Sequence, residues 1–107
     1  MKEIMVIVRP DKVGATKKAL SQAGYPAFTC RHVMGRGKKL EAHGGAPMEL
    51  LPKRQFTLMV PDEAVPQLVN LLMEVNSTGN HGDGRIFVLP VFDSYQVRNG
   101  EPGADAY

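Results

Sequence analysis

The chain has 107 residues, of which 43% are hydrophobic and 22% charged, and this composition fits a single globular domain with one core. Its formal net charge of +2 is too small to predict nucleic-acid binding, and the sequence has no basic stripe interleaved with aromatic residues. Cys30 is the only cysteine, which excludes an intrachain disulfide and a Cys-based zinc site and favours a reducing cytoplasm. The apolar part of residues 1–10 is too short for a signal peptide, and no stretch approaches the length of a membrane span, so we expect no membrane insertion.

The first half of the chain predicts a strand, a helix and a second strand. Residues 4–8 are an unbroken apolar run, which indicates a strand that is buried on both faces. Asp11 is expected to cap a helix that runs to about Ala23 and ends at Gly24. Alternating residues over 27–34 predict the second strand.

The second half repeats this pattern. Residues 53–60 predict a third strand, and Asp62 is expected to cap a helix that runs to about Asn76. Residues 85–91 predict the fourth strand, and residues 95–98 a short extra strand before a polar tail. The order β-α-β-β-α-β is the split βαβ or ferredoxin-like arrangement, an α+β fold in which both helices cover one face of an antiparallel sheet. Because the first strand is apolar on both sides, the uncovered face needs a cover, and a second copy of the chain is the simplest one.

Residues 77–88 combine a glycine-rich turn with the start of a strand. Gly79, Gly82 and Gly84 fall within six residues, and Arg85 follows them. Glycine reaches positive φ without steric cost, and successive N–H groups in such a turn can form an anion-binding concavity. Arg85 adds a permanent positive charge that suits phosphate oxygens. The stretch therefore predicts a polyphosphate site, with a plain helix-to-strand connector as the alternative; without Gly-Lys-Ser/Thr it is not a Walker A loop.

Residues 35–52 form a connection that is long for a small domain. The segment holds four glycines and two prolines, which argue against a helix or strand over most of it. Connections of this length tend to be functional or mobile.

With this layout, the chain resembles the PII signal-transduction family of nitrogen regulation over nearly its whole length. The resemblance rests on Ile7-Val8-Arg9-Pro10 with Lys12, Gly35-Arg36, Leu51-Pro52-Lys53, Thr78-Gly79-x-x-Gly82-Asp83-Gly84-Arg85-Ile86-Phe87 and Arg98-x-Gly100-Glu101. It implies a ferredoxin-like trimer that binds ATP or ADP in the clefts between subunits and senses 2-oxoglutarate together with ATP and magnesium. It also implies one domain over 1–107, with a partner-binding T-loop at 35–52, a B-loop at 77–85 and a C-loop at 96–101.

The resemblance assigns roles to individual residues. The nucleotide-binding positions that it implies are Thr29 at the adenine and Arg36, Gly82, Asp83, Gly84, Arg85 and Arg98 at the phosphates, with Arg36 and Arg98 reaching them from opposite sides of a subunit cleft. Lys53 matches the lysine that pairs with the 2-oxoglutarate carboxylate. The alternatives are solvated arginines, a threonine that favours a strand, and a lysine that protects a strand edge. Neither catalytic residues nor protein metal ligands are expected, since His32, His43 and His81 are scattered.

Three departures from the family pattern bear on function. Gly37 replaces a glutamine that helps to ligate magnesium, so chelation of 2-oxoglutarate through magnesium stays open. Gln96 replaces a second C-loop arginine, which should weaken triphosphate binding by roughly 1.5–3 kcal/mol if that contact was charge-assisted. The segment 35–52 is shorter than usual and has no tyrosine, so uridylylation is not expected.

Gly35-Arg36-Gly37-Lys38 and the missing tyrosine resemble the nitrogenase-associated (NifI-type) branch, whose paired paralogues inhibit nitrogenase when 2-oxoglutarate is low. We therefore expect a homotrimer, alone or mixed with a paralogue, that acts on nitrogenase or a nitrogen-assimilation protein and is not an enzyme. One alternative is a PII-like regulator of a transporter or of another enzyme that responds to a different small molecule. Another is a small hydrolase on this fold, against which the chain has no activated nucleophile or carboxylate pair.

Overall fold

The computed structural model describes residues 1–37 and 50–103. Most of the expected T-loop and the end of the polar tail lie outside these described residues. The elements are β1 (Lys2–Val8), η1 (Pro10–Lys12), α1 (Val13–Gln22), β2 (Thr29–Gly35), β3 (Leu51–Val60), η3 (Asp62–Ala64), α2 (Val65–Asn76) and β4 (Arg85–Pro90). No helix in the described parts of the chain is both long and apolar enough to cross a membrane.

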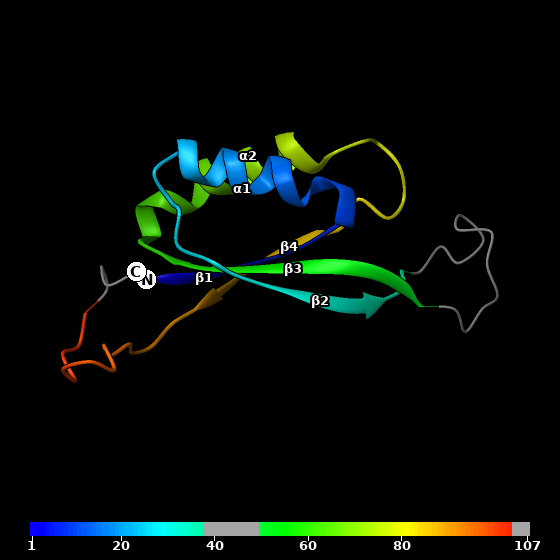
Figure 1. Ribbon diagram of the computed structural model, residues 1–107. Helices are drawn as coiled ribbons and strands as arrows, with labels where there is room; N and C mark the ends of the chain where they lie inside the picture. Colours follow the sequence, from blue (N-terminus) through cyan, green and yellow to red (C-terminus); the bar gives the residue numbers. More distant parts are fainter. Residues whose placement is uncertain (38–49, 104–107) are drawn as a thin grey trace.

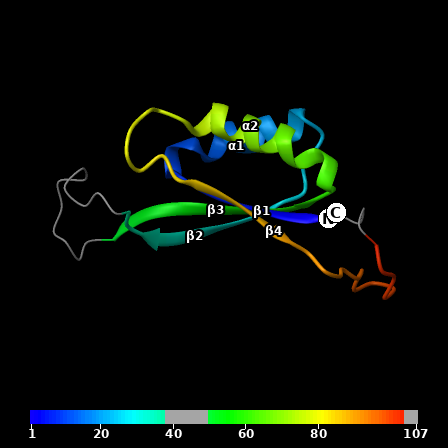
Figure 2. The same cartoon turned by 180° about the vertical axis from the view of Figure 1, so that it is seen from behind.

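The four strands form one antiparallel sheet in the order β2-β3-β1-β4. Both helices lie on the same face of this sheet, as Figure 1 shows, and the view from behind in Figure 2 agrees. The arrangement confirms the predicted α+β, ferredoxin-like βαββαβ fold. We call the face of the sheet without helices the open face.

The core lies between the sheet and the helices. Ile4, Val6 and Val8 of β1 are buried, and so are the other core residues Leu20, Phe56, Leu58, Val60, Ala64, Leu68 and Leu72. The residues between them in β1, Met5 and Ile7, face the open side and are only partly buried. The prediction that this strand is buried on both faces is therefore wrong for the single chain, because the helices cover one face only.

A polar pair joins the two helices inside this core. Thr16 of α1 and Asn76 of α2 are buried, with the Thr16 Oγ1 3.4 Å from the Asn76 Oδ1. The Thr16 hydroxyl donates to the Lys12 carbonyl at 2.8 Å, and the Asn76 Nδ2 donates to the Leu72 carbonyl at 3.0 Å. Thr16 and Leu20 are the buried residues of α1.

The helix starts differ from the predicted caps. Neither Asp11 nor Asp62 caps a helix, because each lies in a short 3-10 turn that precedes α1 or α2, and these starts have no side-chain cap bond. In these turns backbone carbonyls take the first N–H groups: Lys12 N donates to Arg9 O and Ala64 N to Pro61 O, both at 3.0 Å. The carboxylate of Asp62 instead lies 2.7 Å from the Met1 amine, which lowers the pKa of Asp62.

The predicted extra strand over 95–98 is wrong as well. Residues 97–99 form a turn, and the segment's only ladder contact in the described chain is a single bridge between Tyr95 and Pro102. Gln96 N donates to Glu101 O at 2.9 Å and Gly100 N to Gln96 O at 2.7 Å, so the backbone bonds close within the segment. The sequence 96–101 therefore makes a compact turn beyond the end of β4.

The loop of residues 77–84, here called the glycine loop, joins α2 to β4 and passes against the backbone of β1. Gly84 has a φ of +109°, and a Cβ at this position would lie 1.7 Å from the Ile7 carbonyl oxygen. Only glycine allows this approach. The contact places the loop beside the end of β1, where Ile7 pairs with Arg85.

We expect Leu72→Ala to lower the free energy of unfolding by about 2–5 kcal/mol, because it removes buried methyl groups and leaves a cavity. Leu72 is 1% exposed, whereas its neighbour Met73 is 50% exposed. Urea unfolding of both alanine variants measures the difference. A loss in Met73→Ala as large as in Leu72→Ala would contradict this placement of the core.

We expect Gly84→Ala to cost more stability than Gly79→Ala. Both glycines have positive φ, which strains alanine by about 1–3 kcal/mol. A Cβ on Gly79 would meet nothing within 4 Å, whereas on Gly84 it would overlap the β1 backbone and add about 1–3 kcal/mol of overpacking. Urea unfolding of the two variants checks this, and equal losses would show that the contact with β1 does not matter.

Candidate functional site

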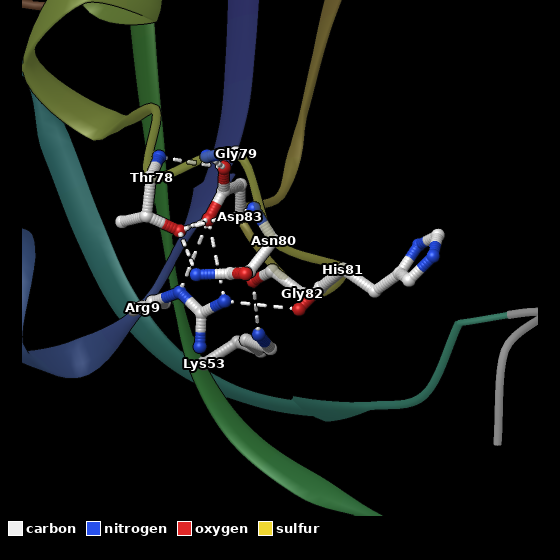
Figure 3. A network of polar contacts seen from close by, with 8 residues as sticks. All are labelled: Arg9, Lys53, Thr78, Gly79, Asn80, His81, Gly82 and Asp83. Carbon is white, nitrogen blue, oxygen red and sulfur yellow. Dashed lines mark hydrogen bonds and ion pairs between the residues drawn. The ribbon is translucent and has the colours of Figure 1, made fainter. Parts of the chain in front are cut away.

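The glycine loop meets the ends of two central strands. It leaves α2 at Ser77, whose extended conformation ends the helix, and enters β4 at Arg85. Figure 3 shows the loop against Arg9, which follows β1, and Lys53, which lies near the start of β3. Residues that are far apart in the sequence therefore form one polar cluster.

The carboxylate of Asp83 is the centre of this cluster. It accepts hydrogen bonds from the backbone N–H of Thr78 at 2.7 Å and of Gly79 at 3.0 Å, and from the Thr78 hydroxyl. These bonds, the Thr78 hydroxyl bond first, together with Arg9 hold the pKa of Asp83 well below its usual range. Asp83 is thus an anion inside the loop that fixes the path of the residues before it.

Arg9 supplies the positive charge opposite Asp83. Its Nε and Nη2 lie 3.3 and 3.2 Å from the Asp83 Oδ1, and its Nη2 also donates to the His81 carbonyl at 2.9 Å. The His81 ring itself points away from the cluster (Figure 3). Arg9 therefore ties the glycine loop to β1 by a charge-assisted, forked contact.

Lys53 holds the loop from β3. Its ammonium donates to the Gly82 carbonyl at 2.6 Å. Partial burial and the neighbouring charge of Arg9 lower the pKa of Lys53, while Asp83 and Asp11 oppose this shift. The lysine that the sequence predicts at a dicarboxylate site thus lies in direct contact with the predicted phosphate loop.

Three backbone donors of the glycine loop make no bond within the described part of the chain. The backbone N–H groups of Gly82, Asp83 and Gly84 donate no hydrogen bond to any of the described residues. Gly82 and Gly84 have φ values of +98° and +109°, which L-residues with a side chain rarely adopt. The Arg85 side chain is exposed beside them, with its guanidinium carbon 6.0 Å from the centroid of the Phe87 ring. Adjacent backbone donors and a guanidinium are the elements of a phosphate site.

A groove of about 400 Å³ reaches the loop from the helix side of the sheet. It lies between α2 and β4, and its walls include Val69, Leu72 and Val88, with Gly84 and Arg85 at the loop. Lys53 lies on the opposite side, because β3 alternates and its helix-facing residues are Phe56 and Leu58. The glycine loop thus borders an apolar groove on one side and a basic cluster on the other.

The structure brings together five of the predicted site residues: Lys53, Gly82, Asp83, Gly84 and Arg85. It does not bring Thr29 or Arg98 to them within one chain. Thr29 is exposed at the start of β2, opposite Thr57, four positions along β3 from Lys53. Arg98 lies in the turn 97–99, and Figure 1 shows the segment after β4, drawn in orange, at the opposite end of the sheet from the yellow glycine loop.

Arg36 follows directly after β2 and is exposed. Gly35 pairs with Leu51, so the described ends of the 35–52 segment lie side by side near the start of β3. The middle of that segment, 38–49, lies outside the described residues. Among the described residues, no group of three or more His, Cys, Asp or Glu side chains is placed to hold a metal ion.

Sequence reasoning found no role for Arg9 and Thr78, although both lie in the motifs that carry the resemblance. The available signal for Arg9 was a cation directly after an apolar strand and before Pro10. This signal does not tell which loop the cation meets, because that depends on the register of β1 with β4.

Comparison with known proteins agrees with this architecture. The family model described as "Nitrogen regulatory protein P-II" matches residues 1–101. The chain is 40% identical to a "Nitrogen fixation nifHD region glnB-like protein 2" of Methanococcus maripaludis, with 99% of each chain covered. It is 44% identical to a "Nitrogen fixation nifHD region GlnB-like protein 1" of Methanothermococcus thermolithotrophicus, with 96% of this chain and 99% of the relative covered.

A third relative carries the family name itself. The "Nitrogen regulatory protein P-II 2" of Methanothermobacter thermautotrophicus is 39% identical, with 99% of this chain and 96% of the relative covered. The fold, the glycine loop and these matches lead to one conclusion. The chain belongs to the nitrogen regulatory P-II family, in the NifI-type branch whose members are named for the nitrogen-fixation region.

Proposed function

We propose that this P-II protein is a sensor that binds ATP or ADP through the phosphates at the glycine loop and regulates a target protein of nitrogen metabolism. The observation that carries the proposal is the loop itself. Its backbone N–H groups at 82–84 donate no hydrogen bond within the described chain, and the exposed Arg85 is the next residue. Preorganised donors of this kind bind anions without further ordering of the backbone.

A complete nucleotide site needs a second copy of the chain in this proposal. The loop lies at one end of the sheet, whereas the turn with Arg98 lies at the other (Figure 1). The open face still carries partly buried apolar residues such as Met5 and Ile7, which a neighbouring copy would cover. A homotrimer, alone or mixed with a paralogue, would place Thr29 and Arg98 of one copy at the loop of the next.

The second effector is 2-oxoglutarate, with Lys53 as its counter-charge. Lys53 already contacts the loop at the Gly82 carbonyl, so a ligand at its ammonium would lie next to the nucleotide phosphates. Mg²⁺ would be held by the two ligands and water, since Gly37 offers no side chain. Arg36 lies near the start of the segment 35–52 and Lys53 directly follows its end, so ligand binding can shift the conformations of that segment, which touches the target.

The target in this proposal is nitrogenase or a nitrogen-assimilation protein. The names of the relatives place their genes in a nitrogen-fixation region, which supports this choice. The role is regulatory rather than catalytic. Isothermal titration with ATP and ADP, with and without 2-oxoglutarate and Mg²⁺, tests the core of the proposal, and a protein that binds neither nucleotide would overturn it.

We expect Arg98→Ala to weaken ATP binding by at least about 1.5 kcal/mol, the lower end for a hydrogen bond to a charged group. Titration calorimetry measures the change in Kd. Lys18→Ala, which removes the same charge from the exposed face of α1, is the control and should bind as the parent protein does. An unchanged Kd in Arg98→Ala would contradict the role of the 96–101 turn.

We expect Lys53→Met to abolish the effect of 2-oxoglutarate on ATP affinity, with a loss of about 1.5–3 kcal/mol in 2-oxoglutarate binding. Arg54→Met is the control, because this neighbouring cation of β3 points to the other face of the sheet. The measurement is ATP titration at saturating and at zero 2-oxoglutarate. A response that survives in Lys53→Met would move the dicarboxylate site elsewhere.

A further inference from the structure

We infer that Arg9 is a positioning residue of the nucleotide site: through Asp83 it holds the glycine loop in the conformation that presents the N–H groups of 82–84 to phosphate. The inference rests on the proposed nucleotide-binding function and adds to it that Arg85 and Arg9 have different roles. Arg85 faces the ligand, whereas the charge of Arg9 is used inside the protein.

The geometry makes Arg9 and Asp83 one unit. Two nitrogens of the Arg9 guanidinium lie within 3.3 Å of the same Asp83 oxygen, and the other Asp83 oxygen accepts the N–H groups of Thr78 and Gly79. The pair is partly shielded from water, since the two side chains are 30% and 22% exposed. Arg9 also donates to the His81 carbonyl, so it contacts the loop at both His81 and Asp83.

A loop of this composition needs such a restraint. Gly79, Gly82 and Gly84 give the backbone a large conformational freedom that is lost when the loop is ordered. Asp83 orders the loop, but its carboxylate would repel phosphate if it were unpaired. Arg9 removes this repulsion because it neutralises the carboxylate, and it restricts the freedom of the loop because it fixes the carboxylate to the end of β1.

The rival reading is that Arg9 is itself a phosphate ligand and Asp83 only a neighbouring negative charge. The two readings predict opposite signs for Asp83→Asn. Removing a negative charge near a polyphosphate should tighten ATP binding if Asp83 merely repels it. If Asp83 orders the loop for Arg9, the same substitution should weaken ATP binding.

The test is ATP titration calorimetry on the full chain, its Arg9→Met and Asp83→Asn variants and the double variant. We expect each single substitution to raise the Kd at least about fivefold, the lower end of coupling between linked groups. The double variant should be no weaker than the weaker single variant, because both remove the same contact. Lys18→Met controls for the loss of one positive charge.

Two outcomes of this titration would overturn the inference. One is tighter ATP binding in Asp83→Asn. The other is an Arg9→Met effect that is as large in the Asp83→Asn background as in the parent protein, which would indicate direct contact with phosphate.

A measurement without nucleotide separates this inference from the proposed function. Amide hydrogen exchange followed by NMR should be at least about fivefold faster at Thr78 and Gly79 in Arg9→Met, and unchanged at Leu20 in α1, which reports that the protein is folded. Arg9→Lys keeps the charge but not the fork, and should restore protection in part. If the parent protein bound no ATP, the proposed function would fail, and unchanged exchange at Thr78 and Gly79 would then overturn the role of Arg9 as well.

Discussion

The site depends on the register of the central strand. Ile7 of β1 pairs with Gln55 of β3 on one side and with Arg85 of β4 on the other. These two pairings bring the end of β1, the start of β3 and the glycine loop to the same end of the sheet. A shift of one residue in either pairing would turn side chains to the opposite face and separate Arg9 and Lys53 from the loop.

Within that arrangement, charged side chains hold the loop through contacts of the protein with itself, without a ligand. Asp83 accepts backbone and hydroxyl donors from Thr78 and Gly79, Arg9 balances its charge, and Lys53 takes the Gly82 carbonyl. The bonds from Thr78 and Gly79 lie within the loop, whereas Arg9 and Lys53 join the loop to the end of β1 and the start of β3. The sheet therefore supports the loop. Binding to a preordered loop costs less conformational entropy than binding to a mobile one.

The large-scale features could be predicted because they follow from local patterns. The order of strands and helices and the glycine-rich turn are both properties of short windows of sequence. The errors have two kinds of cause, one local and one that involves distant parts of the chain. Whether Asp11 and Asp62 cap helices depended on 3-10 turns that satisfy the same N–H groups, and whether β1 is buried on both faces depended on which elements cover the sheet.

The same holds for the site. The glycines and Arg85 lie in one short stretch and could be predicted as site residues from the sequence. Lys53 could be predicted from the resemblance to the family. The contacts of Lys53 with Gly82 and of Arg9 with Asp83 could not be predicted, because they cross between strands whose register is a property of the whole sheet. Residues 95–98 alternate like a strand, but the backbone bonds of the segment close within the turn.

The separation of the glycine loop and the Arg98 turn to opposite ends of the sheet has a consequence for an assembly of unlike subunits. In the proposed trimer, each nucleotide would be held by the loop of one polypeptide and the turn of another. Exchange of one subunit for a paralogue with a different turn would then alter the affinity of a pocket whose loop is unchanged. A cell that carries the genes for both paralogues could therefore adjust its response to adenylate levels through the ratio in which it expresses them.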